Sequence, residues 1–318
     1  MALGFICVAG AGTILGIMPT IQKQVMLNGL PMYSLMLYTS WTITIVCILA
    51  ALIRKHSLKA SKVQVIQGLL MGVFGLFLTP ILLNSSYLYL PVGTTLMLNF
   101  LYPAIVCVIM GVGFKAGFTR LQIAAIVVSI LGMAFLTGAG GDLSGKGIAM
   151  AIASAFTYGI YLVGNEKGPV NELPIEVKMF YISLPGAAAF SVIAPAAGSF
   201  VVPDNITTWV MAIGGSGLFT VGGYFLMIYG IGKLGASTAA FVSMVEPIVS
   251  TVFGTLWFRD PVTVGIVAGS CLVVGSILLI AIDGYQKSKR GRQSKAGQTN
   301  DRLNNSGSAD IINRIRCQ

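Results

Sequence analysis

Residues 90–119, LPVGTTLMLNFLYPAIVCVIMGVGFKAGFT, return 144 residues later as 234–263, LGASTAAFVSMVEPIVSTVFGTLWFRDPVT, and the two stretches align without a gap. Each is an apolar run of helix length with a central proline, Pro103 in the first and Pro247 in the second, followed by a short polar turn and a second apolar run. A two-fold internal repeat in a membrane chain is typical of secondary transporters.

The composition of the chain points to a membrane protein. Of its 318 residues, 55% are hydrophobic and only 9% are charged, whereas about 25% of the residues of soluble domains are charged. An apolar run of about 20 residues crosses a bilayer core as a helix. We therefore predict an all-α integral membrane protein with ten transmembrane helices. The predicted spans are 3–21, 32–53, 65–83, 92–114, 121–138, 147–164, 179–200, 206–231, 236–258 and 262–282.

The positive charges predict the orientation of these spans. If both termini lie on one side, all but three of the 20 Lys and Arg residues lie on that side too, the exceptions being Lys23, Lys146 and Arg259. Because cytoplasmic loops are enriched in Lys and Arg, we expect a multi-pass protein of the cell membrane with both termini cytoplasmic. The net charge of +10 then reflects the topology of the chain. We also expect the basic tail to contact anionic membrane lipid. We expect no nucleic-acid partner, because the basic tail lacks interleaved aromatic residues.

The spacing of the two copies predicts their relative orientation. The first copy begins at the predicted fourth helix and the second at the ninth, and an odd number of intervening spans inverts the second copy in the membrane. The expected organisation is two inverted five-helix repeats, 1–143 and 144–285, followed by a basic, disordered cytoplasmic tail, 286–318.

One carboxylate falls in the middle of a predicted span. Glu246 lies in the ninth span between long apolar stretches, where a charge costs roughly 2.5 to 3.5 kcal/mol on insertion scales. The functional interpretation is a coupling site or a site for a substrate amine. The structural alternative is a protonated side chain that hydrogen-bonds a neighbouring helix.

The paired prolines predict helix breaks beside this carboxylate. A proline leaves the carbonyl four residues earlier without its helical hydrogen bond, which would free the carbonyls of Asn99 and Ser243 near the membrane centre. Two matched breaks favour a pocket over two ordinary kinks. The further candidates for its lining are Tyr102, Tyr158 and Tyr224, whose rings could stack on a substrate or simply pack between helices.

The sequence contains no motif for catalysis or for a cofactor. It has one histidine and no paired cysteine spacing, so we expect no metal, no cofactor and no enzyme activity. Glycines at helical spacing permit close helix contacts, including those of a homodimer.

The two repeated stretches resemble the signature segments of the EamA family, in the drug/metabolite transporter superfamily. The resemblance rests on 87–93 (YLYLPVG), 99–103 (NFLYP), 234–237 (LGAS), 245–247 (VEP) and 258–261 (FRDP). It implies a secondary carrier, often an exporter of amino acids or other small metabolites, with a central cavity between the halves. The chain departs from the family pattern at one point: Asp260 provides the acidic residue after the second signature helix, whereas Lys115-Ala116 stands after the first.

Taken together, these features predict an exporter of a small organic solute that works by alternating access. A non-transporting membrane receptor or assembly subunit is the alternative, and it predicts a filled core around Glu246 with no cavity. An embedded enzyme would need clustered polar residues that the sequence does not contain.

Overall fold

The computed structural model describes most of the chain up to the tail. The described residues are 2–86, 88–90, 95, 98–115, 117–137, 144–258, 264–265, 267–269, 271–280, 282–283 and 286. The predicted tail beyond residue 286, Arg259, Asp260 and part of the first signature segment lie outside them.

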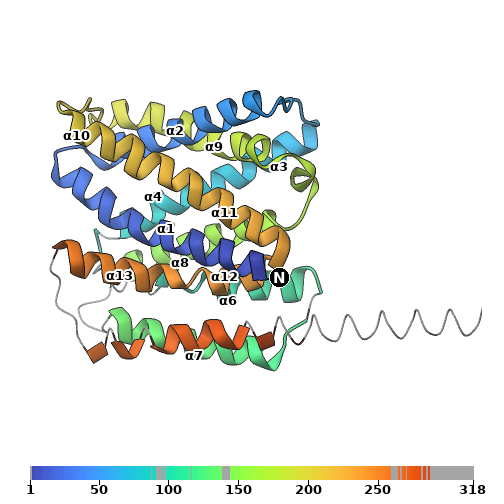
Figure 1. Cartoon of the computed structure of the whole chain (residues 1–318). Helices are drawn as coiled ribbons and strands as arrows, with labels where there is room; N and C mark the ends of the chain where they lie inside the picture. Colours follow the sequence, from blue (N-terminus) through green and yellow to red (C-terminus); the bar gives the residue numbers. More distant parts are fainter. Residues whose placement is uncertain are drawn as a thin grey trace, which may run out of the picture.

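The first half is a series of apolar helices (Figure 1). Its elements are α1 (Ala2–Leu27), α2 (Met32–Ile53), α3 (Lys62–Gly72), the π-helical η1 (Val73–Leu78), α4 (Thr79–Ser86), α6 (Tyr102–Val108), the π-helical η2 (Ile109–Gly113) and α7 (Arg120–Thr137). The start of α3 follows from its sequence, because Ser61 and Gln64 form a reciprocal capping box.

The second half is also a series of apolar helices. Its elements are α8 (Gly145–Gly164), the 3₁₀ turn η3 (Pro169–Glu172), α9 (Ile175–Ala196), α10 (Ile206–Trp209), the π-helical η4 (Val210–Leu218), α11 (Phe219–Leu234), α12 (Ala236–Val242) and α13 (Val245–Phe258). Gly235, with φ of 82°, separates α11 from α12, a backbone conformation that suits glycine.

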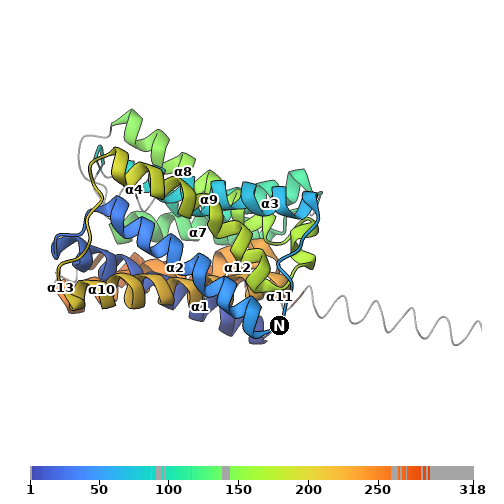
Figure 2. The ribbon, with the colours of Figure 1, turned by 90° about the horizontal axis from the view of Figure 1, so that it is seen from above.

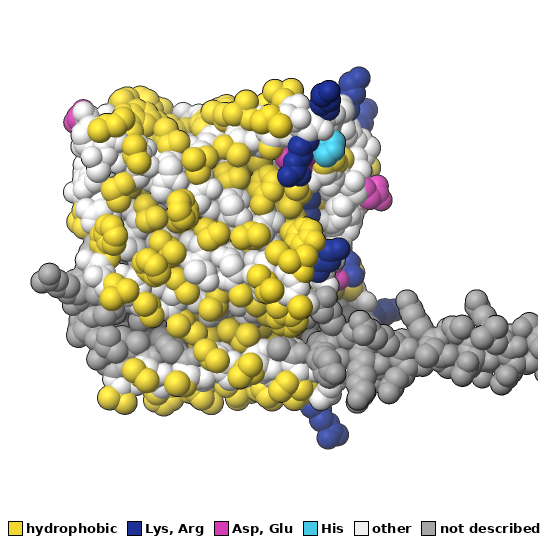
Figure 3. All heavy atoms as spheres, viewed as in Figure 1, with side chains coloured by type: hydrophobic (Ala, Val, Ile, Leu, Met, Phe, Trp, Pro, Cys, Tyr) yellow, Lys and Arg dark blue, Asp and Glu magenta, His cyan; other side chains and the backbone are white. Residues whose placement is uncertain are grey.

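The helices have the length and surface of a membrane protein. Among the described residues, seven helices are long and apolar enough to cross a bilayer, and Tyr102–Gly113, Arg120–Gly132 and Val267–Ile280 are shorter apolar helices. Large apolar side chains cover much of the outer surface (Figure 3). Such a surface suits lipid and not water.

Charged side chains gather at one end of the molecule, which we call the basic end (Figure 3). The N-terminus of α1 lies at this end (Figure 1). The chain reaches the other end, which we call the far end, at the turn between α1 and α2, near the helix α10 (Figures 1 and 2).

The helix contacts recur in the two halves. Helix α1 packs on α11 and α13 of the second half, and α8 correspondingly packs on α4 and α6 of the first half. Helix α2 packs along α9, its counterpart in the other half. Among the described helices, the most extensive packing therefore joins the two halves.

Individual side chains repeat this pattern. Gly16 lies against Val249, and Gly159, 143 residues after Gly16, lies against Ile105, 144 residues before Val249. In the same way, Gly4 lies against Leu234 and Gly147 against Leu90. The sequence repeat is thus also a repeat of packing contacts.

Hydrogen bonds join α2 to the second half and α9 to the first half in the same repeated way. The hydroxyl of Tyr38 in α2 donates to the carbonyl of Val201 (3.0 Å), and that of Tyr181 in α9 donates to the carbonyl of Leu58 (2.6 Å). Tyr181 follows Tyr38 by 143 residues, and Val201 follows Leu58 by the same number.

Candidate functional site

A cavity of about 570 Å³ lies between the two halves. This is within the range of small-molecule sites, roughly 300 to 1,000 Å³. It extends from residues in the middle of the helices toward the far end, where Met26 in its wall is 41% exposed. Its neutral polar lining consists of Thr20, Gln22, Thr39, Ser40, Thr79, Asn84, Asn99, Thr220 and Ser250.

Five of the six residues predicted to bind substrate or to couple transport line this cavity. They are Glu246, Asn99, Tyr102, Tyr158 and Tyr224. The sixth, Ser243, is fully buried behind the wall, where its Oγ lies 2.8 Å from the hydroxyl of Tyr102. Because the Ser243 hydroxyl donates to the carbonyl of Ala240 (3.0 Å), the hydrogen of the first bond comes from Tyr102.

Glu246 lies at a break in the helix that carries it. Helix α12 ends at Val242 and α13 begins at Val245, which places Glu246 in the first turn of α13. The N-terminus of a helix favours a negative charge. The side chain of Glu246 forms no hydrogen bond or ion pair with any residue that the structure describes. A carboxylate in this setting is open to a ligand that enters the cavity.

The prediction that Pro247 leaves the carbonyl of Ser243 without a hydrogen bond is wrong. The Glu246 N–H donates to this carbonyl at 2.9 Å, because the chain forms a tight turn between α12 and α13 instead of a kinked continuous helix. The carbonyl is therefore already hydrogen-bonded. Pro247 falls within the first turn of α13, and Pro103 likewise falls within the first turn of α6.

Tyrosine rings from three helices gather around the carboxylate. Tyr102 of α6, Tyr158 of α8 and Tyr224 of α11 each lie close enough to Glu246 to interact with its charge. The rings of Tyr102 and Tyr158 meet edge to face at 4.8 Å between centroids. A carboxylate beside aromatic faces suits a cationic group.

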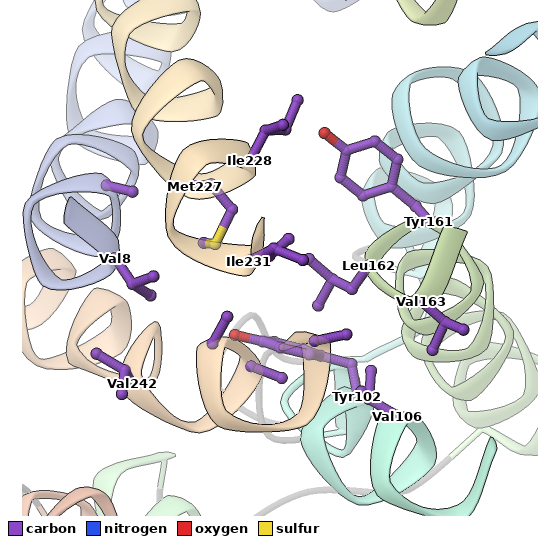
Figure 4. Packing of buried hydrophobic residues seen from close by; sticks show 14 of the residues in the cluster. Val8, Tyr102, Val106, Tyr161, Leu162, Val163, Met227, Ile228, Ile231 and Val242 are labelled. Atoms are coloured by element: carbon purple, nitrogen blue, oxygen red, sulfur yellow. The ribbon is translucent and has the colours of Figure 1, made fainter. Parts of the chain in front are cut away.

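A packed barrier closes the cavity toward the basic end. Tyr102, Leu162 and Ile231 converge there, with Tyr161 and Ile228 beside them (Figure 4). These side chains are nearly or completely buried.

A second, smaller pocket of about 180 Å³ involves segments nearer the basic end. Its lining includes Cys107 and Met110, which follow Tyr102 along the chain, and Ser237 and Thr238, which precede Ser243. Glu166 also lines it, where its carboxylate accepts a hydrogen bond from the N–H of Ala236 and so caps α12. The contact between Tyr102 and Ser243 thus lies between two hollows along the same helices.

A cluster of charged groups at the start of α9 is not among the residues predicted from the sequence. The predicted span 179–200 leaves Lys178 in a loop, but α9 begins at Ile175 and Lys178 is only 3% exposed. Its ammonium group donates to the side chain of Asn171 and to the carbonyl of Asn165. These partners come from the segment between α8 and α9.

Glu176 is the second buried charge of this cluster. One carboxylate oxygen lies 2.6 Å from Nδ1 of His56 and the other 3.7 Å from Arg54. Both partners follow α2, so the charges tie the end of α2 to α9. The described residues contain no group of three His, Cys, Asp or Glu that could hold a metal ion.

Comparison with known proteins adds a family to this geometry. The model of the EamA-like transporter family matches residues 2–138 and 145–282. A similar protein in Synechocystis, "Uncharacterized transporter sll1319", is 28% identical over 226 residues, which are 67% of this chain and 65% of that protein. "Uncharacterized transporter YvbV" of Bacillus subtilis is 23% identical over 203 residues, which are 60% of this chain and 64% of that protein. The matches thus span slightly less than two thirds of either relative.

Two further likenesses agree with these. An "Uncharacterized transporter" of Archaeoglobus fulgidus is 22% identical over 210 residues, which are 66% of this chain and 75% of that protein. A solved crystal structure superposes with a TM-score of 0.74 at 18% identity, covering 90% of this chain and 99% of its own. The last likeness shows the fold alone.

Proposed function

Because this chain belongs to the EamA-like transporter family, we propose that it is a secondary carrier that exports a small organic solute, such as an amino acid or another small metabolite, by alternating access. The family, the relatives named as transporters and the apolar helices make it a multi-pass membrane protein. Its family and its relatives are named as transporters, which points to a protein that is not an enzyme.

The proposal includes ten spans in two inverted five-helix repeats. The seven long and three shorter apolar helices among the described residues support that number, and the recurring contacts between the halves support the repeat. We place the basic end in the cytoplasm, with both termini, because cytoplasmic loops carry the excess of Lys and Arg. The cavity then opens to the outside of the cell membrane.

The observation that carries the proposal is a cavity between the repeats that contains a carboxylate with no hydrogen bond or ion pair to the residues that the structure describes. A receptor or an assembly subunit predicts a filled core at Glu246, whereas this side chain lines about 570 Å³ of space. Binding sites at the interface of two repeats, beside broken helices, are typical of secondary transporters. In this proposal Glu246 binds a coupling proton or the cationic group of the solute, and Asn99, Tyr102, Tyr158 and Tyr224 surround the solute.

Transport by purified protein in proteoliposomes tests the proposal. A panel of amino acids and cationic drugs would be offered with and without a pH gradient. For a solute that is transported, Glu246→Gln should lower the initial rate roughly ten- to a hundredfold, because an interaction with a charged group contributes about 1.5 to 3 kcal/mol. The matched control is Glu172→Gln, which removes an exposed carboxylate outside the cavity and should transport at the unaltered rate.

The outcomes separate the alternatives. If Glu246→Gln transports at the unaltered rate and with the same pH dependence, the role of Glu246 is wrong. If no member of the panel moves, the receptor or assembly subunit becomes the better interpretation.

A further inference from the structure

The internal repeat pairs four residues at the centre of the molecule. A shift of 144 residues takes Tyr102 to Glu246 and Asn99 to Ser243. Tyr102 and Ser243 form one pair across the interface of the halves, and the repeat therefore maps this pair onto Glu246 and Asn99. The two pairs are equivalent by sequence but differ in chemistry.

Only the first of these equivalent pairs is bonded. The hydroxyl of Tyr102 donates to Ser243 at 2.8 Å, at the barrier toward the basic end. The amide of Asn99 instead donates to Ser154 at 2.8 Å. The carboxylate of Glu246 has no hydrogen-bond partner among the described residues, although it lines the same cavity as Asn99. The bonded pair lies on the closed side of the cavity, whereas Asn99 and Glu246 line the cavity without a bond between them.

In a carrier with inverted repeats, alternating access is largely a rocking or gating of one repeat against the other around a fixed site. Because the two halves correspond by sequence, we expect the second conformation to exchange their contacts. We propose that closure of the cavity at the far end forms a hydrogen bond from the Asn99 amide to the Glu246 carboxylate, while the bond between Tyr102 and Ser243 breaks. This inference rests on the alternating access proposed above. It assigns Asn99 a gating role that its present contact with Ser154 does not reveal.

The chemistry of the second pair suits a gate that also releases the solute. An amide N–H bonded to a carboxylate makes a charge-assisted bond, stronger than the neutral bond between Tyr102 and Ser243. Asn99 would occupy one of the acceptor positions that a solute uses on Glu246, so closing the gate would compete with solute binding. Ser154 would lose little, because its hydroxyl keeps its bond to the Ala151 carbonyl.

Cysteine accessibility can measure the balance between the two conformations. In a chain whose native cysteines are replaced by serine, Met26→Cys reports the cavity at the far end and Thr238→Cys the pocket toward the basic end. The measured quantity is the ratio of their labelling rates with a polar maleimide. Tyr102→Phe removes only the hydroxyl of the bonded pair, so it should slow labelling at Met26→Cys and speed it at Thr238→Cys.

A double-mutant cycle then tests the unbonded pair. Asn99→Leu and Glu246→Met should change the labelling ratio non-additively, with a coupling of roughly three- to tenfold, because each removes the same bond of the second conformation. Glu246→Gln still accepts a hydrogen bond and should retain part of the coupling with Asn99. The control cycle of Ser154→Ala with Glu246→Met should be additive.

The results distinguish this inference from the proposed function. If Tyr102→Phe shifts the ratio but Asn99→Leu and Glu246→Met are additive, the gate is wrong and alternating access stands. If the ratio does not respond to Tyr102→Phe, to any gradient or to any transported solute, alternating access fails together with the gate.

Discussion

At the break between α12 and α13, the side chain of Glu246 has no hydrogen bond or ion pair among the described residues. The equivalent position at the start of α6 holds Tyr102, which is 1% exposed and hydrogen-bonded to Ser243. The helix contacts beside these positions correspond, since Gly16 meets Val249 as Gly159 meets Ile105. The halves thus share the contacts that hold helices together and differ in the group that could bind a charge.

A similar difference separates the two ends of the α2 and α9 pair. Tyr38 and Tyr181 make equivalent hydrogen bonds at the far end and the basic end. At the basic end the buried carboxylate of Glu176 adds contacts to His56 and Arg54. Duplicated packing thus sets the fold, and charges that are not duplicated distinguish its two sides.

Substitutions of Gly16 and Gly159, which occupy corresponding positions in the two halves, should show the largest difference in their effect on stability. A Cβ on Gly16 would lie 2.6 Å from the carbonyl oxygen of Glu246, which is backbone and cannot easily move. A Cβ on Gly159 would lie 3.1 Å from a methyl group of Ile105, which can shift. We expect Gly16→Ala to lower the free energy of unfolding by about 1 to 3 kcal/mol and to slow transport.

Gly159→Ala is the control for that substitution. Its small steric cost should be offset by the higher helix propensity of alanine, up to about 1 kcal/mol. Unfolding in detergent, followed by circular dichroism, measures both variants. Equal losses of unfolding free energy in the two variants would show that the helices are packed equally closely at Gly16 and at Gly159.

The next effect concerns the charges at the basic end. Glu176→Gln keeps the size of the side chain but replaces a charge-assisted contact with His56 by a neutral one, so we expect a loss of about 1 to 2 kcal/mol of unfolding free energy. Arg54 is 3.7 Å from Glu176 and its side chain is 61% exposed. Arg54→Gln should therefore cost at most about 0.5 kcal/mol. The free energy of unfolding in detergent, measured for both variants, tests this order. A larger loss for Arg54→Gln than for Glu176→Gln would show that His56 is not the main partner of Glu176.

The membrane class and the repeat could be predicted because they are written along the chain. Apolar runs and a constant spacing of 144 residues need no knowledge of tertiary contacts. The tight turn after Ser243 could not be predicted, since a proline is compatible with both a kink and a restarted helix. The local pattern misplaced the start of α9 because the charge of Lys178 is satisfied by Asn171 and Asn165 in the segment before the helix.

Apart from Asn99, the neutral polar lining of the cavity was missed for a related reason. Threonine and serine residues such as Thr39, Thr79 and Ser40 occur in membrane helices both as packing groups and as ligands, and the sequence alone does not separate these roles. Only the arrangement of helices from both halves brings them into one cavity. Glu246 could be singled out because a carboxylate in a bilayer is costly wherever it points.

The smallest expected effect comes from the two tyrosine hydroxyls that tie the ends of the α2 and α9 pair. Tyr181→Phe removes a partly buried hydrogen bond of 2.6 Å and should cost about 1 kcal/mol, whereas Tyr38→Phe removes a longer bond exposed to solvent and should cost about 0.5 kcal/mol. Both variants lose the same atom at equivalent positions. The difference between their unfolding midpoints therefore measures how strongly each end of the α2 and α9 pair is held, and not an effect of residue type. If Tyr38→Phe lowered the unfolding free energy more than Tyr181→Phe, the hydrogen bond at the far end would be the stronger of the two. The contacts of Glu176 would then compensate for a weaker hydrogen bond at the basic end.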